Sequence, residues 1–407
     1  MQDQTWLQLT MPTSAGGCQL TSATDAAEAA HLACTLQCLP AARAHLRRLL
    51  PEESTEVILQ AVDITQTREI QDRLRTNGIL QDSPAPTDLE GKHLQQIGVP
   101  LETPFKPLAG MQGPIAQAAA RQRMATLRKD SDDRSKVRLD ACTGAGSGAW
   151  CTVIPASDQT RLTDAEFLSA MRWRLGMRQA ASNVRCQHVA AKSQKQCPAF
   201  LDPYLDHAVL CKSGQGVYRL HNTLAHKLRE FAREAGCEAH SEVTVPSLTK
   251  FPGTDQAEEA RLDVHIWAGG AWPLELLVDA TTRHPWAARY RQASLAATTA
   301  AVTTADRRAA SQKEGRYGKM TQGAPIVVAV LGTWGRLSEG LLDLLDLLAR
   351  RAAHARADSG VHAFGRQRRW VEEIAIAQQR CLHRQFSTAL PADCISSITV
   401  PSGAQPV

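Results

Sequence analysis

The sequence predicts an α+β protein: a helical N-terminal region, a small Cys/His segment, then a core in the order helix, three strands, helix, strand, with added C-terminal helices. Three observations support this prediction. Apolar residues recur at helical spacing through much of the chain. Residues 261–267 and 274–280 alternate between apolar and polar types on either side of a glycine-containing turn, which is typical of a β-hairpin. Residues 324–331 form an unbroken apolar run rich in valine, as in a buried strand.

Length, cysteine content and hydropathy limit the class of protein. At 407 residues the chain is long enough for two or three domains with cores of their own. Its 11 cysteines are dispersed and odd in number, which favours reduced thiols with some metal ligation over a disulfide framework. No apolar stretch reaches membrane-spanning length, and even 341–349 is interrupted by Asp343 and Asp346. We therefore expect an intracellular protein with no membrane partner.

The first half of the chain is predicted to be mostly helical. Residues 1–81 carry apolar positions at helical spacing, and residues 82–113, rich in proline, glycine and polar types, form an extended linker. A helical and mixed linker domain follows over 114–180. Its first helix begins at Pro114 and runs to Arg128. Its last helix, 163–176, has a threonine able to cap its start and a glycine at its end.

The region 217–360 contains the predicted core. Its first helix, 219–236, places Leu220, Leu224, Leu228 and Phe231 on one face. The remaining predicted elements are a strand at 241–246, the hairpin at 261–280, a helical stretch at 286–319, the strand at 324–331 and a helix at 336–356. Residues 361–407 are predicted to form a basic amphipathic helix and tail.

The hairpin carries two aspartates, Asp263 and Asp279. If its turn is 269–273, the two lie directly opposite each other, with Cβ atoms about 5 Å apart. Carboxylates that close share a proton or hold a divalent cation between them. The same register gathers the hairpin's apolar residues on one face, namely Leu262, Val264, Ile266, Leu274, Leu276 and Val278. The alternative interpretation is that the aspartates mark the solvent side of a half-exposed hairpin.

A Cys/His cluster precedes the core, within residues 181–216. Its members are Cys186, Cys197, His207 and Cys211, in the spacing C-x10-C-x9-H-x3-C. Three thiolates and an imidazole form a closed tetrahedral set suited to structural zinc, so we predict a small zinc knuckle. The H-x3-C end suits one helical turn. The C-x10-C end is wide, so that His188 could replace one cysteine, and the alternative is a set of buried cysteines with a surface histidine.

The predicted element order resembles the common core of the restriction-endonuclease-like, or PD-(D/E)XK, nucleases. The resemblance implies that Asp263 and Asp279 hold magnesium and that a nearby lysine steadies the transition state. The family pattern expects that lysine at position 281, where this chain has Thr281. Lys313 and Tyr317, one helical turn apart in the following helix, are the substitutes that the chain offers.

Further motifs resemble the C-terminal region of non-LTR retrotransposon polyproteins that carry such an endonuclease. They are L-D-P-Y-L-D-H-A-V-L-C-K-S-G (201–214), H-N (221–222), Arg261-Leu262-Asp263, with leucine where proline is usual, and an upstream segment at 14–33 similar to the one that follows the reverse-transcriptase thumb. The resemblance implies a magnesium-dependent endonuclease that nicks target DNA in the nucleus, with DNA, element RNA and a separate reverse-transcriptase core as partners. No polymerase Y/F-A-D-D box occurs in this sequence.

Several charged residues complete the candidate site. Glu230 is a candidate third magnesium ligand, with Glu242 as its alternative. The candidate nucleic-acid-binding residues are Arg261, Arg316, Arg366, Arg368 and Arg369. A second hypothesis is a catalytically inactive zinc-knuckle module that binds nucleic acid on a degenerate nuclease scaffold, and a third is a plain helical interaction protein.

Overall fold

A computed structural model describes residues 2–20, 27, 30, 112–181, 183–245, 261–270, 273–295, 325–355 and 360–392. The chain divides into two compact units, residues 1–130 and 131–407. In the first unit, α1 (Gln2–Thr10) contacts α6 (Gln112–Lys129). α6 confirms the helix predicted over 114–128, although it begins at Gln112, before Pro114. The helical predictions for the rest of 1–81 fall mostly outside the described residues, and so does the linker. No helix that the structure describes has the length and apolar character needed to cross a membrane.

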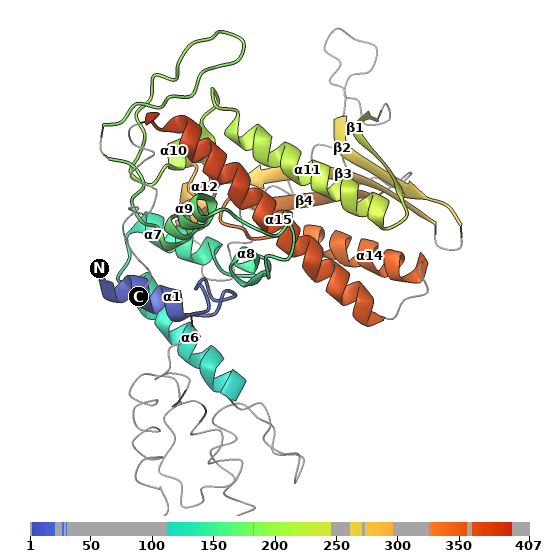
Figure 1. The fold of residues 1–407 in the computed structure, drawn as a ribbon, viewed down its shortest axis with the longest axis horizontal. Coiled ribbons are helices and arrows are strands. Elements are labelled where there is room, and N and C mark those ends of the chain that lie inside the picture. Colours follow the sequence, from blue (N-terminus) through green and yellow to red (C-terminus); the bar gives the residue numbers. More distant parts are fainter. Residues whose placement is uncertain are drawn as a thin grey trace, which may run out of the picture. The chain divides into compact units, whose positions relative to one another are not determined.

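The second unit is an α+β fold built on a four-stranded mixed sheet (Figure 1). Its strands, in sheet order, are β1 (Glu238–Thr244), β2 (Arg261–Ala268), β3 (Leu274–Arg283) and β4 (Ile326–Gly332). β2 pairs antiparallel with both β1 and β3, whereas β4 lies parallel to β3. The strand predictions are confirmed, although β1 begins earlier than predicted.

The register of the β2–β3 hairpin is the one that its apolar alternation predicts. Val264 pairs with Val278 and Ile266 with Leu276, so that the next residues in line are Asp263 and Asp279. All four of these apolar side chains are buried in one hydrophobic cluster. A slip of one residue would move them to the other face of the sheet, which is why burial fixes the register.

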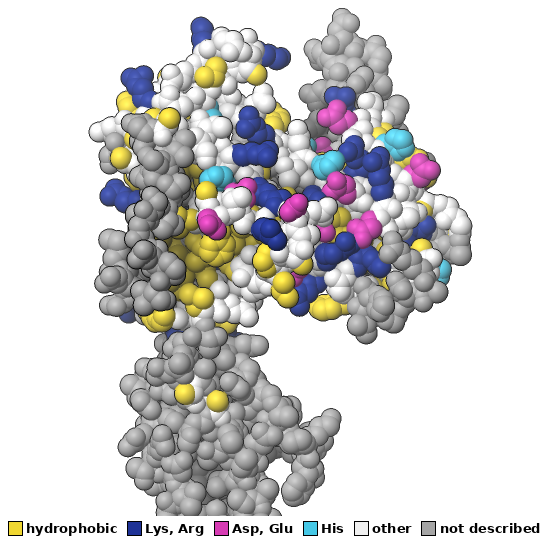
Figure 2. All heavy atoms as spheres, viewed as in Figure 1, with side chains coloured by type: hydrophobic (Ala, Val, Ile, Leu, Met, Phe, Trp, Pro, Cys, Tyr) yellow, Lys and Arg dark blue, Asp and Glu magenta, His cyan; other side chains and the backbone are white. Residues whose placement is uncertain are grey.

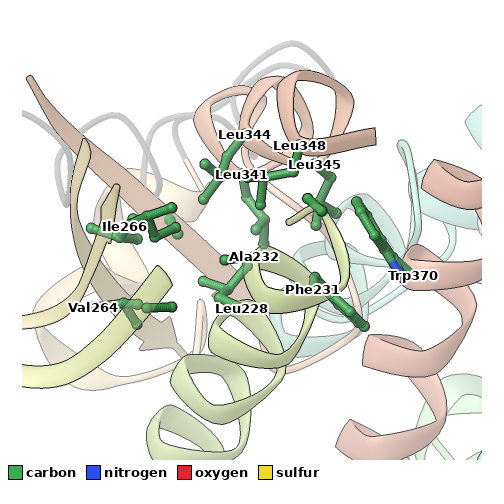
Figure 3. Close-up of a cluster of buried hydrophobic side chains, with 14 of the residues drawn as sticks. Leu228, Phe231, Ala232, Val264, Ile266, Leu341, Leu344, Leu345, Leu348 and Trp370 are labelled. Atoms are coloured by element: carbon green, nitrogen blue, oxygen red, sulfur yellow. The ribbon is translucent and has the colours of Figure 1, made fainter. Parts of the chain in front are cut away.

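Two of the described helices cover the apolar face of the sheet, and a third packs on these two. α11 (Gly216–Glu234) packs against β1, β2 and β3, α14 (Glu339–Ala355) packs against β4, and α15 (Gly360–Ala389) packs against both helices. Leucines of α11 and α14 meet the sheet valines and isoleucine in this cluster (Figure 3). Trp370 of α15 closes it by stacking on Phe231 at 5.0 Å between ring centroids. The amphipathic α11 predicted from leucine spacing is thus the central helix of the core.

Shorter helices flank this core. α9 (Asp164–Leu175) has the predicted ends: Thr163 and Glu166 form a capping box, and Gly176 adopts the left-handed conformation at φ 68°. α7 (Asp133–Ala141) and α8 (Ala149–Thr152) lie on either side of a Gly/Ser-rich turn at 143–148. Of the other described helices in this unit, α10 (Asp206–Leu210) precedes α11, and α12 (Ala288–Leu295) follows β3.

Candidate functional site

The four predicted ligands of the Cys/His cluster come together in the structure. Their ligand atoms all lie within 4.8 Å of one another. Cys186 Sγ is 3.9 Å from Cys211 Sγ, and Cys197 Sγ is 3.5 Å from His207 Nε2. Among the described residues this is the single group of three or more His, Cys, Asp or Glu side chains placed to hold a metal ion. The Cys3His cluster can therefore bind a metal such as zinc.

A two-stranded antiparallel ribbon explains the wide C-x10-C spacing. Its two bridges pair Arg185 with Phe200 and Val189 with Gln196. Inside these bridges, the Cys186 N–H donates to the carbonyl of Ala199 at 3.0 Å, and the Cys197 N–H donates to the carbonyl of His188 at 2.8 Å. The two cysteines thus occupy diagonal positions across the ribbon, where side chains of opposite strands can meet. The ten residues between Cys186 and Cys197 form the rest of the two strands and the turn that joins them.

The H-x3-C half of the cluster is built by α10, as the spacing predicts. The Asp202 carboxylate binds backbone N–H groups at the start of this helix. Its Oδ1 accepts the Asp206 N–H at 3.1 Å, and its Oδ2 accepts the His207 N–H at 2.7 Å. These bonds satisfy backbone donors at the helix start that have no partner within the helix. His207 and Cys211 then lie one turn apart and face the same centre.

His188, the alternative ligand, points elsewhere. Its Nε2 lies 3.0 Å from Thr388 Oγ1 and 3.2 Å from the carbonyl of Gln385, both on α15. Gly214 packs directly against the imidazole, since a Cβ at that position would lie 2.2 Å from His188 Nδ1. His188 therefore helps to join the ribbon to α15, and His207 completes the metal cluster.

The chemistry of the donor set fits zinc. Burial above all, with a smaller contribution from the neighbouring Cys211, raises the pKa of the Cys186 thiol to about 12, against a backbone hydrogen bond that lowers it. Negative charge on sulfur atoms packed this closely in a buried site needs a cation to compensate it. Soft sulfur ligands with one imidazole in a closed set are typical of structural zinc.

A buried polar network, which the sequence did not reveal, fastens this cluster to the sheet. Arg134 of α7 donates to both carboxylate oxygens of Asp206, at 2.5 and 2.8 Å. His284, directly after β3, places Nε2 3.3 Å from Asp206 Oδ1 and Nδ1 2.7 Å from Thr333 Oγ1. Burial alone would raise the pKa of Asp206, but Arg134 and His284 outweigh it and lower that pKa to about 2. Asp206 immediately precedes the ligand His207, so the network fixes the cluster's position.

The aspartate pair occupies the point where the backbone pairing of β2 and β3 ends. One step beyond the Val264–Val278 pair, Asp263 Oδ2 accepts the backbone N–H of Ala280 at 2.7 Å. The carboxylate of Asp263 therefore lies against β3 at the residue next to Asp279. Asp279 is 2% exposed, whereas the side chain of Asp263 retains 19% exposure.

A third side chain reaches the pair from α11. His221 Nε2 lies 3.0 Å from Asp263 Oδ1, and the imidazole is 27% exposed. Glu230, predicted as a possible third carboxylate, instead contacts Lys227 at 2.9 Å and His226 at 3.0 Å. It follows His221 by nine residues, or about 14 Å along the helix axis. The residue that α11 brings to Asp263 is thus His221.

The remaining predicted residues have varied surroundings. Lys313, Arg316 and Tyr317 lie outside the described residues. Arg261 of β2 pairs with Glu242 at 3.3 Å, which involves the alternative acidic ligand in a surface ion pair.

The basic residues of α15 also contact acids of the same unit. Arg368 pairs with Glu372 at 2.9 Å, and Arg369 pairs with Glu234 and, at 3.7 Å, with Glu373. Arg366 also takes part in an interaction. Figure 2 shows Lys and Arg side chains interspersed with Asp and Glu on one face of the molecule. A nucleic acid bound here would have to compete with these internal pairs.

Comparison of the chain with models of known protein families finds no match, and comparison with curated proteins finds none either. The fold and the sites together define an α+β protein with a Cys3His cluster that can bind a metal and, on its central hairpin, two neighbouring aspartates.

Proposed function

We propose that this protein is a magnesium-dependent DNA endonuclease of the restriction-like class. The observation that carries the proposal is the β2–β3 hairpin, whose register places Asp263 and Asp279 next to each other at the end of their paired segment. The Asp263 carboxylate is bound to the β3 backbone beside Asp279. Two carboxylates held in this way are a common means of binding a divalent ion.

The arrangement of the core supports the same class. α11 precedes three antiparallel strands, and α12 and then β4 follow in the sequence, with β4 parallel to β3. The same order and strand directions are what the resemblance to PD-(D/E)XK nucleases implies. In that arrangement the second and third strands carry the acids, as Asp263 on β2 and Asp279 on β3 do here.

The donor set of the aspartate pair fits magnesium. Mg²⁺ usually binds one or two carboxylates and completes its shell with waters and substrate phosphates, so the pair needs no third protein ligand. Bound there, the ion would polarise a phosphate and lower the pKa of a bound water. Asp263 and Asp279 would hold it, and the resemblance assigns charge stabilisation to Lys313 and phosphate positioning to Tyr317.

The biological role that we propose follows from the retrotransposon resemblance. The protein would nick target DNA in the nucleus so that the free 3′ end primes reverse transcription by a polymerase core outside this sequence, with element RNA as template. The Cys3His cluster would hold a structural zinc. Asp206 is hydrogen-bonded to Arg134 and adjacent to the ligand His207, so it would hold the zinc-bound cluster in a fixed position relative to the nuclease core.

A nicking assay on supercoiled plasmid with Mg²⁺ tests this proposal. Asp263→Asn and Asp279→Asn should each lower nicking about 100-fold or more, because a catalytic metal contributes several kcal/mol to transition-state stabilisation. Glu275→Gln is the matched control: Glu275 is also an acid of β3, but its side chain is 61% exposed and pairs with His265. Equal nicking by wild type and both aspartate variants would refute the assignment.

One observation favours the second candidate function, a module that binds nucleic acid without cleaving it. The two-stranded ribbon that carries Cys186 and Cys197 exposes Arg185, Lys192 and Lys195, and the sequence from Met177 to Leu201 contains no acidic residue. Arg185 also lies over the ring of the exposed Phe200, at 5.1 Å. DNA binding that weakens with salt and is lost on zinc chelation, with no nicking by the wild type, would favour this function.

A further inference from the structure

His221 reaches Asp263 from a part of α11 that is tightly fixed. The helix begins at Gly216, whose carbonyl accepts a 2.5 Å hydrogen bond from Gln385 Nε2 of α15. A Cβ on Gly216 would lie 2.6 Å from Gln385 Oε1 and 2.8 Å from the carbonyl oxygen of Val209, so a glycine permits this close approach. Leu220, the residue before His221, is fully buried. The imidazole is therefore presented to Asp263 by a rigid element.

Both oxygens of the Asp263 carboxylate are held. The Ala280 N–H fixes Oδ2 at 2.7 Å, and His221 Nε2 lies 3.0 Å from Oδ1. A carboxylate oxygen has two lone pairs, so Oδ1 can accept the imidazole N–H and still bind a cation. With only the backbone bond, the carboxylate could turn about that single contact. The second bond fixes the plane of the carboxylate.

The surroundings of this pair differ from those of the other His–carboxylate pairs nearby. In the His226–Glu230 pair, on the same helix, the Glu230 side chain is 43% exposed. In the His265–Glu275 pair, on the same hairpin, the Glu275 side chain is 61% exposed. The Asp263 side chain is only 19% exposed. A hydrogen bond that is shielded from water orients its partner more strongly than one on an open surface.

We propose that His221 is a positioning residue of the aspartate pair. Its Nε2–H holds Oδ1 of Asp263 in the orientation that binds a divalent cation together with Asp279. The inference rests on the proposed metal-dependent function, and His221 acts through Asp263 rather than on the substrate. Partners that orient a metal-binding carboxylate typically change metal affinity 10- to 100-fold.

Binding of Mn²⁺, measured by electron paramagnetic resonance on the full, zinc-loaded chain, tests the inference without relying on cleavage. Wild type should bind Mn²⁺ at a site that Asp263→Asn removes. His221→Ala and His221→Leu should both weaken this binding about 10- to 100-fold. His221→Gln, whose side-chain amide can donate to the same oxygen, should restore most of the affinity. His265→Gln, in the exposed pair on the same strand, should bind Mn²⁺ like wild type.

The outcomes separate this inference from the proposed function. Wild-type Mn²⁺ affinity in His221→Ala would overturn the positioning role and leave the metal site standing. Equal binding by wild type and Asp263→Asn would overturn both. His221→Leu fills the space of the imidazole without a donor, so restored affinity in this variant would show that only packing matters and would also overturn the positioning role.

Discussion

Asp206 shows how one side chain can connect three parts of a fold. Its carboxylate accepts two hydrogen bonds from Arg134 of α7 and contacts His284 at the end of β3, while its own backbone begins the helix that carries His207. Arg134 also lies over the ring of Tyr204, at 4.0 Å. Buried charges are tolerated when they are paired and hydrogen-bonded in this way, and removing one partner leaves the other uncompensated.

Arg134→Met should therefore destabilise the second unit strongly. The variant keeps the length of the side chain but leaves the Asp206 carboxylate buried without its main donor, so the free energy of unfolding should fall by about 3–5 kcal/mol. Lys136→Met is the control, because Lys136 pairs with Asp133 at 3.6 Å on the surface and should contribute less than about 1 kcal/mol. Urea unfolding measures both. A loss in Arg134→Met no larger than in Lys136→Met would contradict the role given to the buried pair.

Single residues differ in how far the sequence predicts their contacts. The register around Asp263 was predictable because alternating apolar residues must share one buried face, and the structure confirms it. The Arg134–Asp206 bond was not, because its partners are 72 residues apart and neither has a local pattern. His221 was visible as part of an H-N motif, but only the packing of α11 on β2 brings it to Asp263.

At the scale of elements, the sequence predicts helices and strands that have a local periodic pattern. It does not predict the structure of segments that depend on contacts with residues distant in the sequence. α9, the hairpin and β4 follow from caps, alternation and β-branched content. The ribbon that carries Cys186 and Cys197 has no such periodic pattern, and two isolated bridges define its strands. Its C-x10-C spacing is explained only by the pairing of these strands. The basic stretch of α15 resembles a nucleic-acid surface in sequence, yet Glu234 and Glu373 engage its Arg369 in the fold.

The packing of α15 on α11 gives an element-scale prediction. Trp370 is fully buried and stacks on Phe231 (Figure 3). Its Nε1 donates a hydrogen bond to Glu234 Oε2 at 2.9 Å. Trp370→Ala should lower the free energy of unfolding by about 3–5 kcal/mol, because it removes a large core side chain and leaves a cavity between the helices. Phe364→Ala, on the same helix but 69% exposed, should change it by no more than about 0.5 kcal/mol. Similar denaturation midpoints for the two variants would argue against α15 as part of the core.

At the scale of the whole second unit, the metal cluster belongs to the hydrophobic core. Cys186, Cys197 and Cys211 fall in one buried cluster with Trp173 and Trp334 and with the C-terminal part of α15, which contributes Leu382 and Phe386. Loss of order at the cluster should therefore spread into α15, and through α15 to the helices on the sheet. A module joined only by a flexible linker would behave differently, since it could unfold alone.

Zinc removal should consequently destabilise the whole second unit. An ion that binds only the folded state stabilises it by RT ln(1 + [L]/Kd), about 4 kcal/mol when zinc is at 1,000 times its Kd, and the cluster is absent from the unfolded chain. A chelator or Cys197→Ser should lower the melting temperature and abolish bound zinc, with wild type holding one zinc per chain by elemental analysis. Cys151→Ser, outside the cluster, should leave both unchanged. Added Mg²⁺ should not restore the melting temperature, since a hard cation does not replace zinc among thiolates. A wild-type melting temperature indifferent to zinc would show that hydrophobic packing alone holds the ribbon against α15, and the cluster would then have no structural role.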